Sequence, residues 1–189
     1  MSVFNSCSLD VAMEEDTNAI MESEPKVVEL ALRTGEPIII DDLIETDIST
    51  ARASDAAGED RGRFNISLKF LLPPTERPQE VFDLADARWE RIIIRDVPSI
   101  TGTIPSAFNN FPPAVDGTLD DIVIEVALAP IDGPGGILGQ AGPNFVRTSD
   151  FLPISDVMFF DVDDLEFLES LDLFEDVIVH EMGHVLPHL

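Results

Sequence analysis

The end of the chain contains the residues best suited to chemistry, in the order His180-Glu181-Met182-Gly183-His184. Residues four apart lie on one face of a helix, so both imidazoles can reach a single Zn²⁺ at about 2.0–2.1 Å. The metal lowers the pKa of a bound water, and Glu181 is placed to take the proton of that water as it attacks a peptide carbonyl. The spacing therefore predicts a hydrolytic zinc site with His180 and His184 as ligands and Glu181 as general base.

The same pattern also occurs in proteins that bind no zinc. The alternative is that His180 and His184 are two surface histidines on a C-terminal helix. All three histidines of the chain fall in its last ten residues, the third being His188. His188 would share the face of the other two only if the helix continued through Pro187, whose ring clashes with the preceding turn. We therefore expect His188 to be a tail residue rather than a ligand.

A helix must carry this motif, and the sequence around it contains start and stop signals. Asp172 and Glu175 have the spacing of a capping box, in which each side chain accepts a free N–H of the first turn. Pro187 is expected to end the helix. The apolar face is expected to consist of Phe174, Val177, Ile178 and Val185.

Upstream of the motif, hydrophobic periodicity predicts strands and one further helix. Strands are expected at residues 64–70, 121–128 and 157–160 because apolar residues alternate or form short runs there. The helix is expected at residues 78–95. Its buried face would consist of Phe82, Ala85, Trp89 and Ile92.

Two segments between these elements are rich in turn-forming residues. Residues 97–119 contain Pro, Gly, Ser and Asn, and residues 132–142 are rich in glycine. We expect both to be loops. The order of the elements predicts a small α/β domain in which helices back a sheet.

The first third of the chain differs in pattern from the rest. Residues 1–62 are acidic and show little periodicity, and residues 49–63 are small and polar, as in a linker. We expect residues 1–62 to be a mostly disordered acidic segment and residues 63–189 to be the folded region. Cys7 is the single cysteine, which excludes an internal disulfide.

The overall charge excludes one class of partner. The chain has 37 Asp and Glu residues against 11 Lys and Arg residues and a net charge of −26. Such a field repels phosphate backbones, so we expect no nucleic-acid partner. No run approaches the ~18 apolar residues of a membrane helix, and the N-terminus lacks the pattern of a signal peptide. We expect a soluble protein without a signal peptide or a membrane-spanning segment.

The segments around the motif resemble the metzincin clan of zinc peptidases, and most closely the leishmanolysin-like proteins of bacteria and algae. The resemblance covers residues 63–186. It rests on the alternating segment 64–70, the Trp89 helix, the loop DGPGGILGQAGP and the segment DVIVHEMGHVL, in the family's order. It implies an α/β fold, namely a metzincin-like N-terminal subdomain with a twisted mixed sheet, a backing helix and an active-site helix. It also implies a zinc-dependent metalloendopeptidase acting on a peptide or protein substrate, with residues 63–189 as the N-terminal part of the catalytic domain.

The resemblance further implies a calcium site. Residues 132–135 are similar to the matrixin loop that wraps a structural Ca²⁺, and residues 160–164 to the acidic segment that completes it. Asp132, Asp161 and Asp164 would then share a Ca²⁺ with carbonyls of the loop, because calcium prefers several oxygen ligands. The alternative is that these residues only form turns. By the same resemblance, residues 137–141 would form the edge strand along which a peptide substrate pairs.

The chain departs from the clan after His184. Metzincins continue as HExxHxxGxxH, where the glycine turns the chain and a third histidine reaches the metal. Here Pro187 stands at the position of the glycine and the sequence ends at Leu189, so we expect a truncated member of the clan. Catalytic zinc normally has three protein ligands. The alternative function is therefore a catalytically inactive acidic module with the same fold that binds calcium or a protein.

Overall fold

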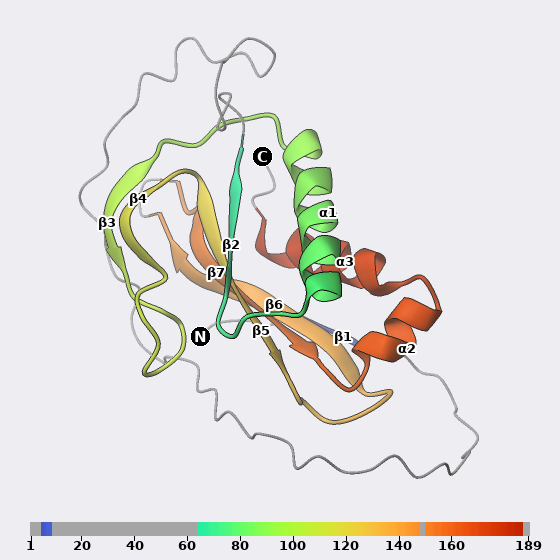
Figure 1. Cartoon of the computed structure of the whole chain (residues 1–189). Helices are drawn as coiled ribbons and strands as arrows, with labels where there is room; N and C mark the ends of the chain where they lie inside the picture. The colour runs from blue at the N-terminus through green and yellow to red at the C-terminus, as the bar shows by residue number, and fades with distance from the viewer. Residues whose placement is uncertain (1–4, 9–63, 148–149, 187–189) are drawn as a thin grey trace, which may run out of the picture.

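The computed structural model describes residues 5–8, 64–147 and 150–186 (Figure 1). The acidic segment expected at residues 1–62 lies outside the described residues, except for four residues that form a strand. This strand, β1 (Asn5–Ser8), was not anticipated by the prediction of a disordered segment.

A five-stranded mixed sheet forms the centre of the fold, in the order β1-β6-β7-β5-β2. Its other strands are β2 (Ile66–Phe70), β5 (Ile122–Ala129), β6 (Ile137–Val146) and β7 (Pro153–Asp161). Strands β2, β5 and β7 are parallel to one another. Strand β6 is antiparallel to both β7 and β1. The mixed α/β class predicted from the sequence is thus confirmed.

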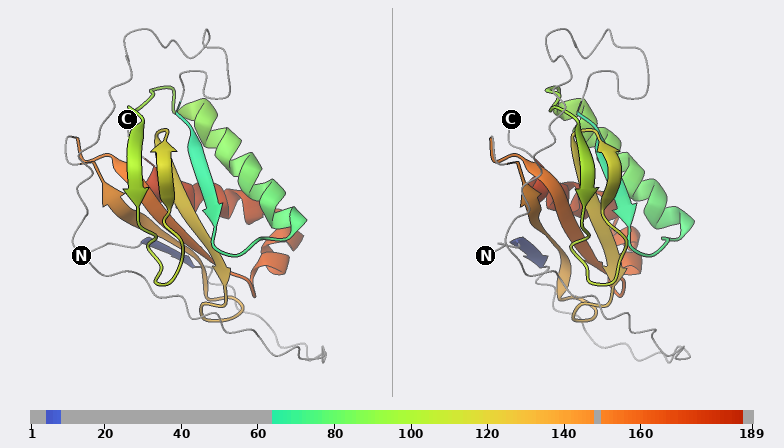
Figure 2. Two further views of the ribbon diagram at one scale, coloured as in Figure 1. Left: turned by 60° about the vertical axis from the view of Figure 1, so that its left-hand side comes forward. Right: turned by 90° about the vertical axis from the view of Figure 1, so that its left-hand side faces the viewer.

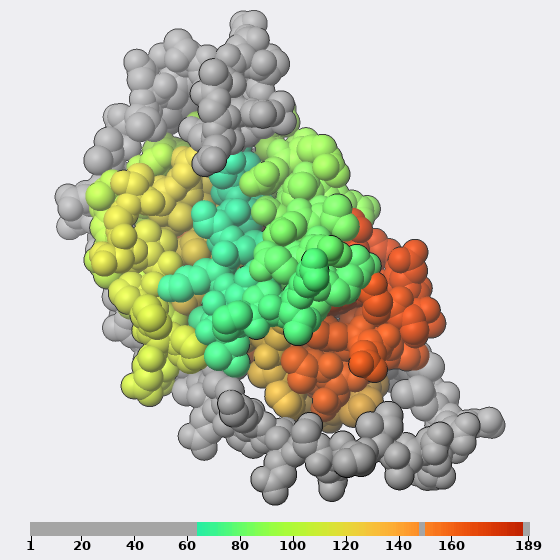
Figure 3. Space-filling model, viewed as in Figure 1, coloured from blue at the N-terminus to red at the C-terminus, as the bar shows by residue number. Residues whose placement is uncertain are grey.

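Helices cover one face of this sheet (Figure 2). They are α1 (Glu76–Ile92), α2 (Leu165–Ser170) and α3 (Phe174–Val185). In the space-filling view, α1 lies directly against β2, and the segment containing α2 and α3 continues the same surface (Figure 3). None of the helices in the described part of the chain is long and apolar enough to cross a membrane.

The main core lies between the helices and the sheet. Phe82 of α1 is fully buried and makes edge-to-face contacts with Phe70, Phe160 and Phe174, with ring centroids 5.2, 5.2 and 6.2 Å apart. Such contacts add to the burial of the rings. The helix prediction is confirmed, although Ile92, expected on the buried face, is 60% exposed at the last residue of α1.

The segment expected to be an irregular loop at residues 97–119 instead contains a β-hairpin. Strands β3 (Ile100–Ile104) and β4 (Val115–Leu119) pair in antiparallel register. The strands themselves are rich in β-branched residues, and the asparagines and all the prolines except Pro98 lie in the connection between them. The hairpin covers the face of the sheet opposite the helices. Its buried cluster consists of Ile100, Ile104, Ala114, Leu119, Val123, Phe145 and Ile154.

The glycine-rich loop is shorter than expected from composition. It ends before Ile137, where β6 begins, so Gly139 and Gly142 belong to a strand. The prediction that residues 137–141 form the edge of the sheet is also wrong, because β1 pairs with exactly this part of β6 and takes the edge position.

The start of α3 differs from the predicted capping box. The N-cap is Leu173, without a side-chain cap hydrogen bond, and Asp172 has a positive φ of 58°. Asp172 instead ends α2, because its N–H bonds to the carbonyl of Glu169 and that of Leu173 to the carbonyl of Leu168. This pairing is a Schellman motif, which requires a left-handed residue at the position of Asp172. At its other end α3 finishes at Val185, and Leu186 is extended, as expected for a residue before proline.

Truncation of the central aromatic residue should test the helix–sheet core. We expect Phe82→Ala to lower the free energy of unfolding by about 3–5 kcal/mol, because it removes a fully buried ring and leaves a cavity. Leu84→Ala is the matched control on the same helix, since Leu84 is 53% exposed, and should change stability by only about 0.5 kcal/mol. Denaturant unfolding measures both; equal effects would contradict this account of the core.

Candidate functional site

His180 and His184 lie on one face of α3 and point toward each other. Their Nε2 atoms are 3.1 Å apart, and the ring planes are nearly perpendicular, at 84°, with centroids 4.7 Å apart. Two ring nitrogens facing each other at this distance either form an N–H···N hydrogen bond or bind a metal ion between them. Since Zn²⁺ binds imidazole nitrogen at about 2.0–2.1 Å, both atoms can reach one ion. The donor set and its spacing therefore fit zinc.

Glu181 lies beside this pair but faces the sheet. Its side chain is fully buried, and neither carboxylate oxygen has a hydrogen-bond partner among the described residues. Burial raises the pKa of Glu181 to about 7. A buried carboxyl group without partners is costly for a protein to keep, and a carboxyl with a pKa near neutrality can both accept and return a proton.

Two glycines allow α3 to approach its neighbours closely. A Cβ on Gly139 of β6 would lie 3.1 Å from Cγ of Glu181 and 3.1 Å from ring carbons of Phe160. A Cβ on Gly183 would lie 3.3 Å from the indole of Trp89. The same indole donates from Nε1 to the carbonyl of Val179 at 3.0 Å, which ties α1 to α3.

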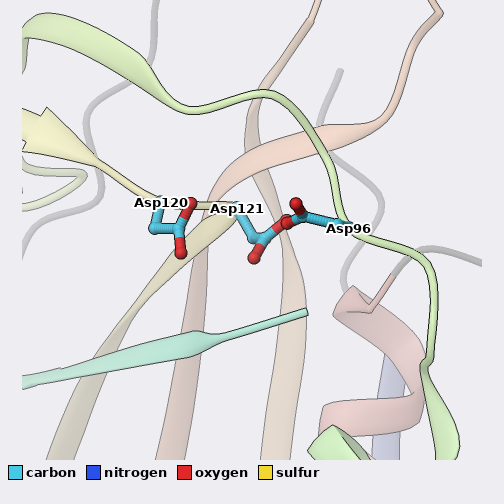
Figure 4. A group of neighbouring side chains, drawn as sticks. All are labelled: Asp96, Asp120 and Asp121. Carbon is cyan, nitrogen blue, oxygen red and sulfur yellow. The ribbon is translucent and has the colours of Figure 1, made fainter. Parts of the chain in front are cut away.

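No third ligand joins the histidine pair among the described side chains. His188 lies outside the described residues. The described part of the chain contains one group of three side chains that could hold a metal ion, Asp96, Asp120 and Asp121, and no histidine belongs to it (Figure 4). The group was not anticipated from the sequence, although the two consecutive aspartates before a buried strand could have indicated it.

The aspartate group joins the beginnings of several strands. The carboxylate of Asp121 accepts the N–H groups of Asn65 and Val97, at 2.8 and 2.6 Å. Asp120 accepts the side chains of Asn65 and Ser99, at 3.0 and 2.7 Å. Burial raises the pKa of Asp121 to about 8, with the nearby Asp120 and Asp96 charges adding to the rise and the two N–H bonds opposing it. These contacts give Asp120 and Asp121 a structural role.

The three residues expected to bind calcium do surround the glycine loop, but they contact its N–H groups rather than its carbonyls. The N–H groups of Ile131, Asp132, Gly133 and Asp163 donate to Asp161, at 3.0 to 3.1 Å. Asp164 accepts the N–H of Gly135 at 2.7 Å, and Asp132 that of Ile137 at 2.9 Å. Gly133 and Gly135 have φ values of 86° and 79°, which glycine adopts without strain. The loop conformation is thus accounted for by carboxylates alone, and calcium binding stays a prediction.

Comparisons of the chain with known protein families, curated proteins and solved structures found no match. A function must therefore be inferred from the geometry of α3 and of β6, the strand beside it. The sequence identified His180, Glu181 and His184, but the roles of Gly139 and Gly183 as contact points emerge only from the fold.

Adding a methyl group at Gly139 should disturb the site. We expect Gly139→Ala to lower the free energy of unfolding by about 1–3 kcal/mol, because Glu181 or Phe160 must move to accommodate the new Cβ. Gln140→Ala is the matched control, since neighbouring residues of a strand point to opposite faces. Thermal and denaturant unfolding compare the two variants, and a Gly139→Ala protein as stable as Gln140→Ala would rule out the close contact.

Asp161, which accepts N–H groups of the glycine loop, should make the free energy of unfolding depend on pH. Burial alone would raise the pKa of Asp161, but the four N–H bonds outweigh it and lower the pKa below its ordinary value of 3.8. The stabilisation is therefore present above pH 3.8 and lost as the pH falls through the lower folded pKa. We expect Asp161→Asn to cost about 1.5–3 kcal/mol at pH 7, and the difference from wild type to shrink below pH 3.8.

The neighbouring Asp163 provides the control for this experiment. Its side chain is exposed, and Asp163→Asn keeps the backbone N–H that Asp161 accepts. Unfolding by denaturant at several pH values measures all three proteins. A constant difference between wild type and Asp161→Asn from pH 7 down to pH 3 would contradict the assignment.

Proposed function

We propose that this chain is the N-terminal part of the catalytic domain of a metzincin-like, zinc-dependent metalloendopeptidase that hydrolyses peptide bonds. The observation that carries the proposal is the convergence of the His180 and His184 Nε2 atoms to 3.1 Å on α3, next to the buried, unpartnered carboxyl of Glu181. A histidine pair on a surface helix without a function would give no reason to bury the glutamate between them.

Each residue of the motif has a distinct role in this proposal. His180 and His184 hold the ion through Nε2. Zinc, when bound, lowers the pKa of a water and polarises the scissile carbonyl. Glu181 takes the proton of the attacking water and returns it to the leaving amine, a task for which a pKa near 7 is well suited.

The surrounding elements support the same function by fixing the motif. Trp89 holds α3 from the side of α1, and Gly139 lets Glu181 lie against β6. Strand β6 is thus adjacent to the proposed reacting centre. Catalytic zinc has three protein ligands in most enzymes, and His188 is the remaining histidine of the chain.

Zinc titration by calorimetry tests the proposal. We expect His180→Ala/His184→Ala to weaken zinc binding at least ~100-fold, because both ligands supplied by α3 are removed. Glu181→Gln should retain zinc binding but reduce peptide hydrolysis about 10²–10⁴-fold, the usual contribution of a general base. His188→Ala, measured in the same series, shows whether that residue completes the site.

Two outcomes would separate this proposal from its alternative. Equal zinc affinity of wild type and the double histidine variant would refute the metal site. Zinc binding without hydrolysis in the wild type, together with thermal stabilisation by Ca²⁺ that Glu181→Gln leaves unchanged, would instead support an inactive calcium- or protein-binding module.

A further inference from the structure

Helix α1 and the residues just after it carry most of the positive charge of the described part of the chain. Of the six lysine and arginine residues there, four lie within residues 76–95, namely Arg77, Arg88, Arg91 and Arg95. Arg77 and Arg88 pair with acidic residues of α1, α2 and α3. Arg91 and Arg95 are exposed and have no ion-pair partner among the described residues. In a chain with a net charge of −26, this end of α1 is suited to an acidic partner.

The exposed residues at the start of α1 carry the opposite charge. Glu76, Glu80 and Asp83 are all exposed, and the side chain of Glu80 keeps 57% of its surface accessible. The outer face of α1 is therefore acidic at one end and basic at the other. Two copies of such a helix attract each other when they run antiparallel, because each acidic end then meets a basic end. Parallel helices would bring like charges together.

A seam for helix packing runs along this outer face. Glu80, Leu84, Ala87 and Arg91, which we call the α1 seam, follow one another at spacings of four, three and four residues. This spacing is typical of the contact face between two helices. Leu84 is 53% exposed and Ala87 is partly exposed. Figure 3 shows α1 at the surface of the molecule that faces the viewer. The α1 seam thus has an apolar centre with opposite charges at its two ends.

We propose that the α1 seam binds a second copy of this chain, with the two α1 helices packed antiparallel about a two-fold axis. With the axis at the level of residues 85–86, Glu80 of each subunit faces Arg91 of the partner subunit. Leu84 of each subunit then faces Ala87 of the partner subunit. Each contact occurs twice, as in any isologous dimer. The inference is independent of the proposed function, because it uses no residue of the histidine motif.

A single pair of helices makes a small interface, so the dimer is weak. Interfaces of this size belong to the transient class. Exposed ion pairs contribute little to affinity, but they select the partner and fix its orientation. We expect a dissociation constant of ~10–100 µM. Dilute protein in an unfolding experiment is then a monomer, in which Leu84 is exposed as described above.

Charge reversal in the full chain tests the pairing by sedimentation equilibrium. Glu80→Arg makes both charge contacts of the dimer repulsive, and Arg91→Glu does the same with the opposite sign. We expect each variant to dimerise at least ~10-fold more weakly than wild type. An equimolar mixture of the two variants should recover wild-type affinity, because each contact of the mixed dimer again joins an arginine to a glutamate. Glu166→Arg, which changes the net charge equally at an exposed position of α2, is the matched control and should dimerise as wild type does.

A zero-length cross-link provides a second test that preserves every charge. Arg91→Lys keeps the positive charge, and a carbodiimide joins its amine to a carboxylate in direct contact with it. Positions 80 and 91 of one helix are about 16 Å apart at 1.5 Å per residue, so an amide between them can form only between two subunits. We expect mass spectrometry to find peptides joined at positions 80 and 91 in Arg91→Lys, and none in Glu80→Gln/Arg91→Lys.

Three results would overturn the inference. The first is wild-type protein that sediments as a monomer well above the expected dissociation constant. The second is a mixture of the two reversal variants that dimerises no better than either variant alone. The third is a cross-link from position 91 of Arg91→Lys to a carboxylate within residues 9–63 and none to position 80, which would make the acidic segment of the same chain the occupant. Zinc binding by His180 and His184 is measured separately and stands or falls independently of these results.

Discussion

The position of α3 depends on how closely the helix can approach its neighbours. Helix α3 contacts α1 at Gly183 and β6 at Gly139, and at both points a Cβ would come within 3.3 Å of the facing side chain. Because cores are close-packed, a bulkier residue at either glycine would force α3 to move outward. The orientation of the helix determines in turn that Glu181 is buried against the sheet, whereas the shared face of the two histidines follows from their spacing of four residues.

Acidic side chains hold much of the remaining framework, in a chain whose net charge is −26. Asp161 and Asp121 accept backbone N–H groups from distant segments, and Glu125 accepts that of Ala107 at 2.7 Å. The pKa shifts of Asp161 and Asp121 are nevertheless opposite. The N–H bonds prevail at Asp161 and lower its pKa, whereas burial prevails at Asp121 and raises its pKa to about 8. Carboxylates thus anchor several segments, including the glycine loop, where the sequence alone indicated a metal site or turns.

Much of the fold was predictable where apolar residues repeat with a clear period, as in β2, β5, β7 and the two longer helices. The hairpin of β3 and β4 was missed because Gly102 and Gly117, which face each other across it, indicated a loop. Asp172 was misassigned because the same residue type caps a helix start and ends the preceding helix in a left-handed conformation. The proposed site residues His180, Glu181 and His184 followed from their spacing alone. Their close neighbours did not, because Trp89, Gly139 and the motif meet only through long-range packing.

The central claim is that His180 and His184 together bind one zinc ion. The most direct measurement is anomalous diffraction at the zinc edge from crystals of the full chain grown with zinc. We expect an anomalous peak within about 2.0–2.1 Å of Nε2 of both residues. A peak elsewhere, such as at the Asp96, Asp120 and Asp121 group, with none between the two histidines, would contradict the claim and leave the close approach of their rings as a hydrogen bond.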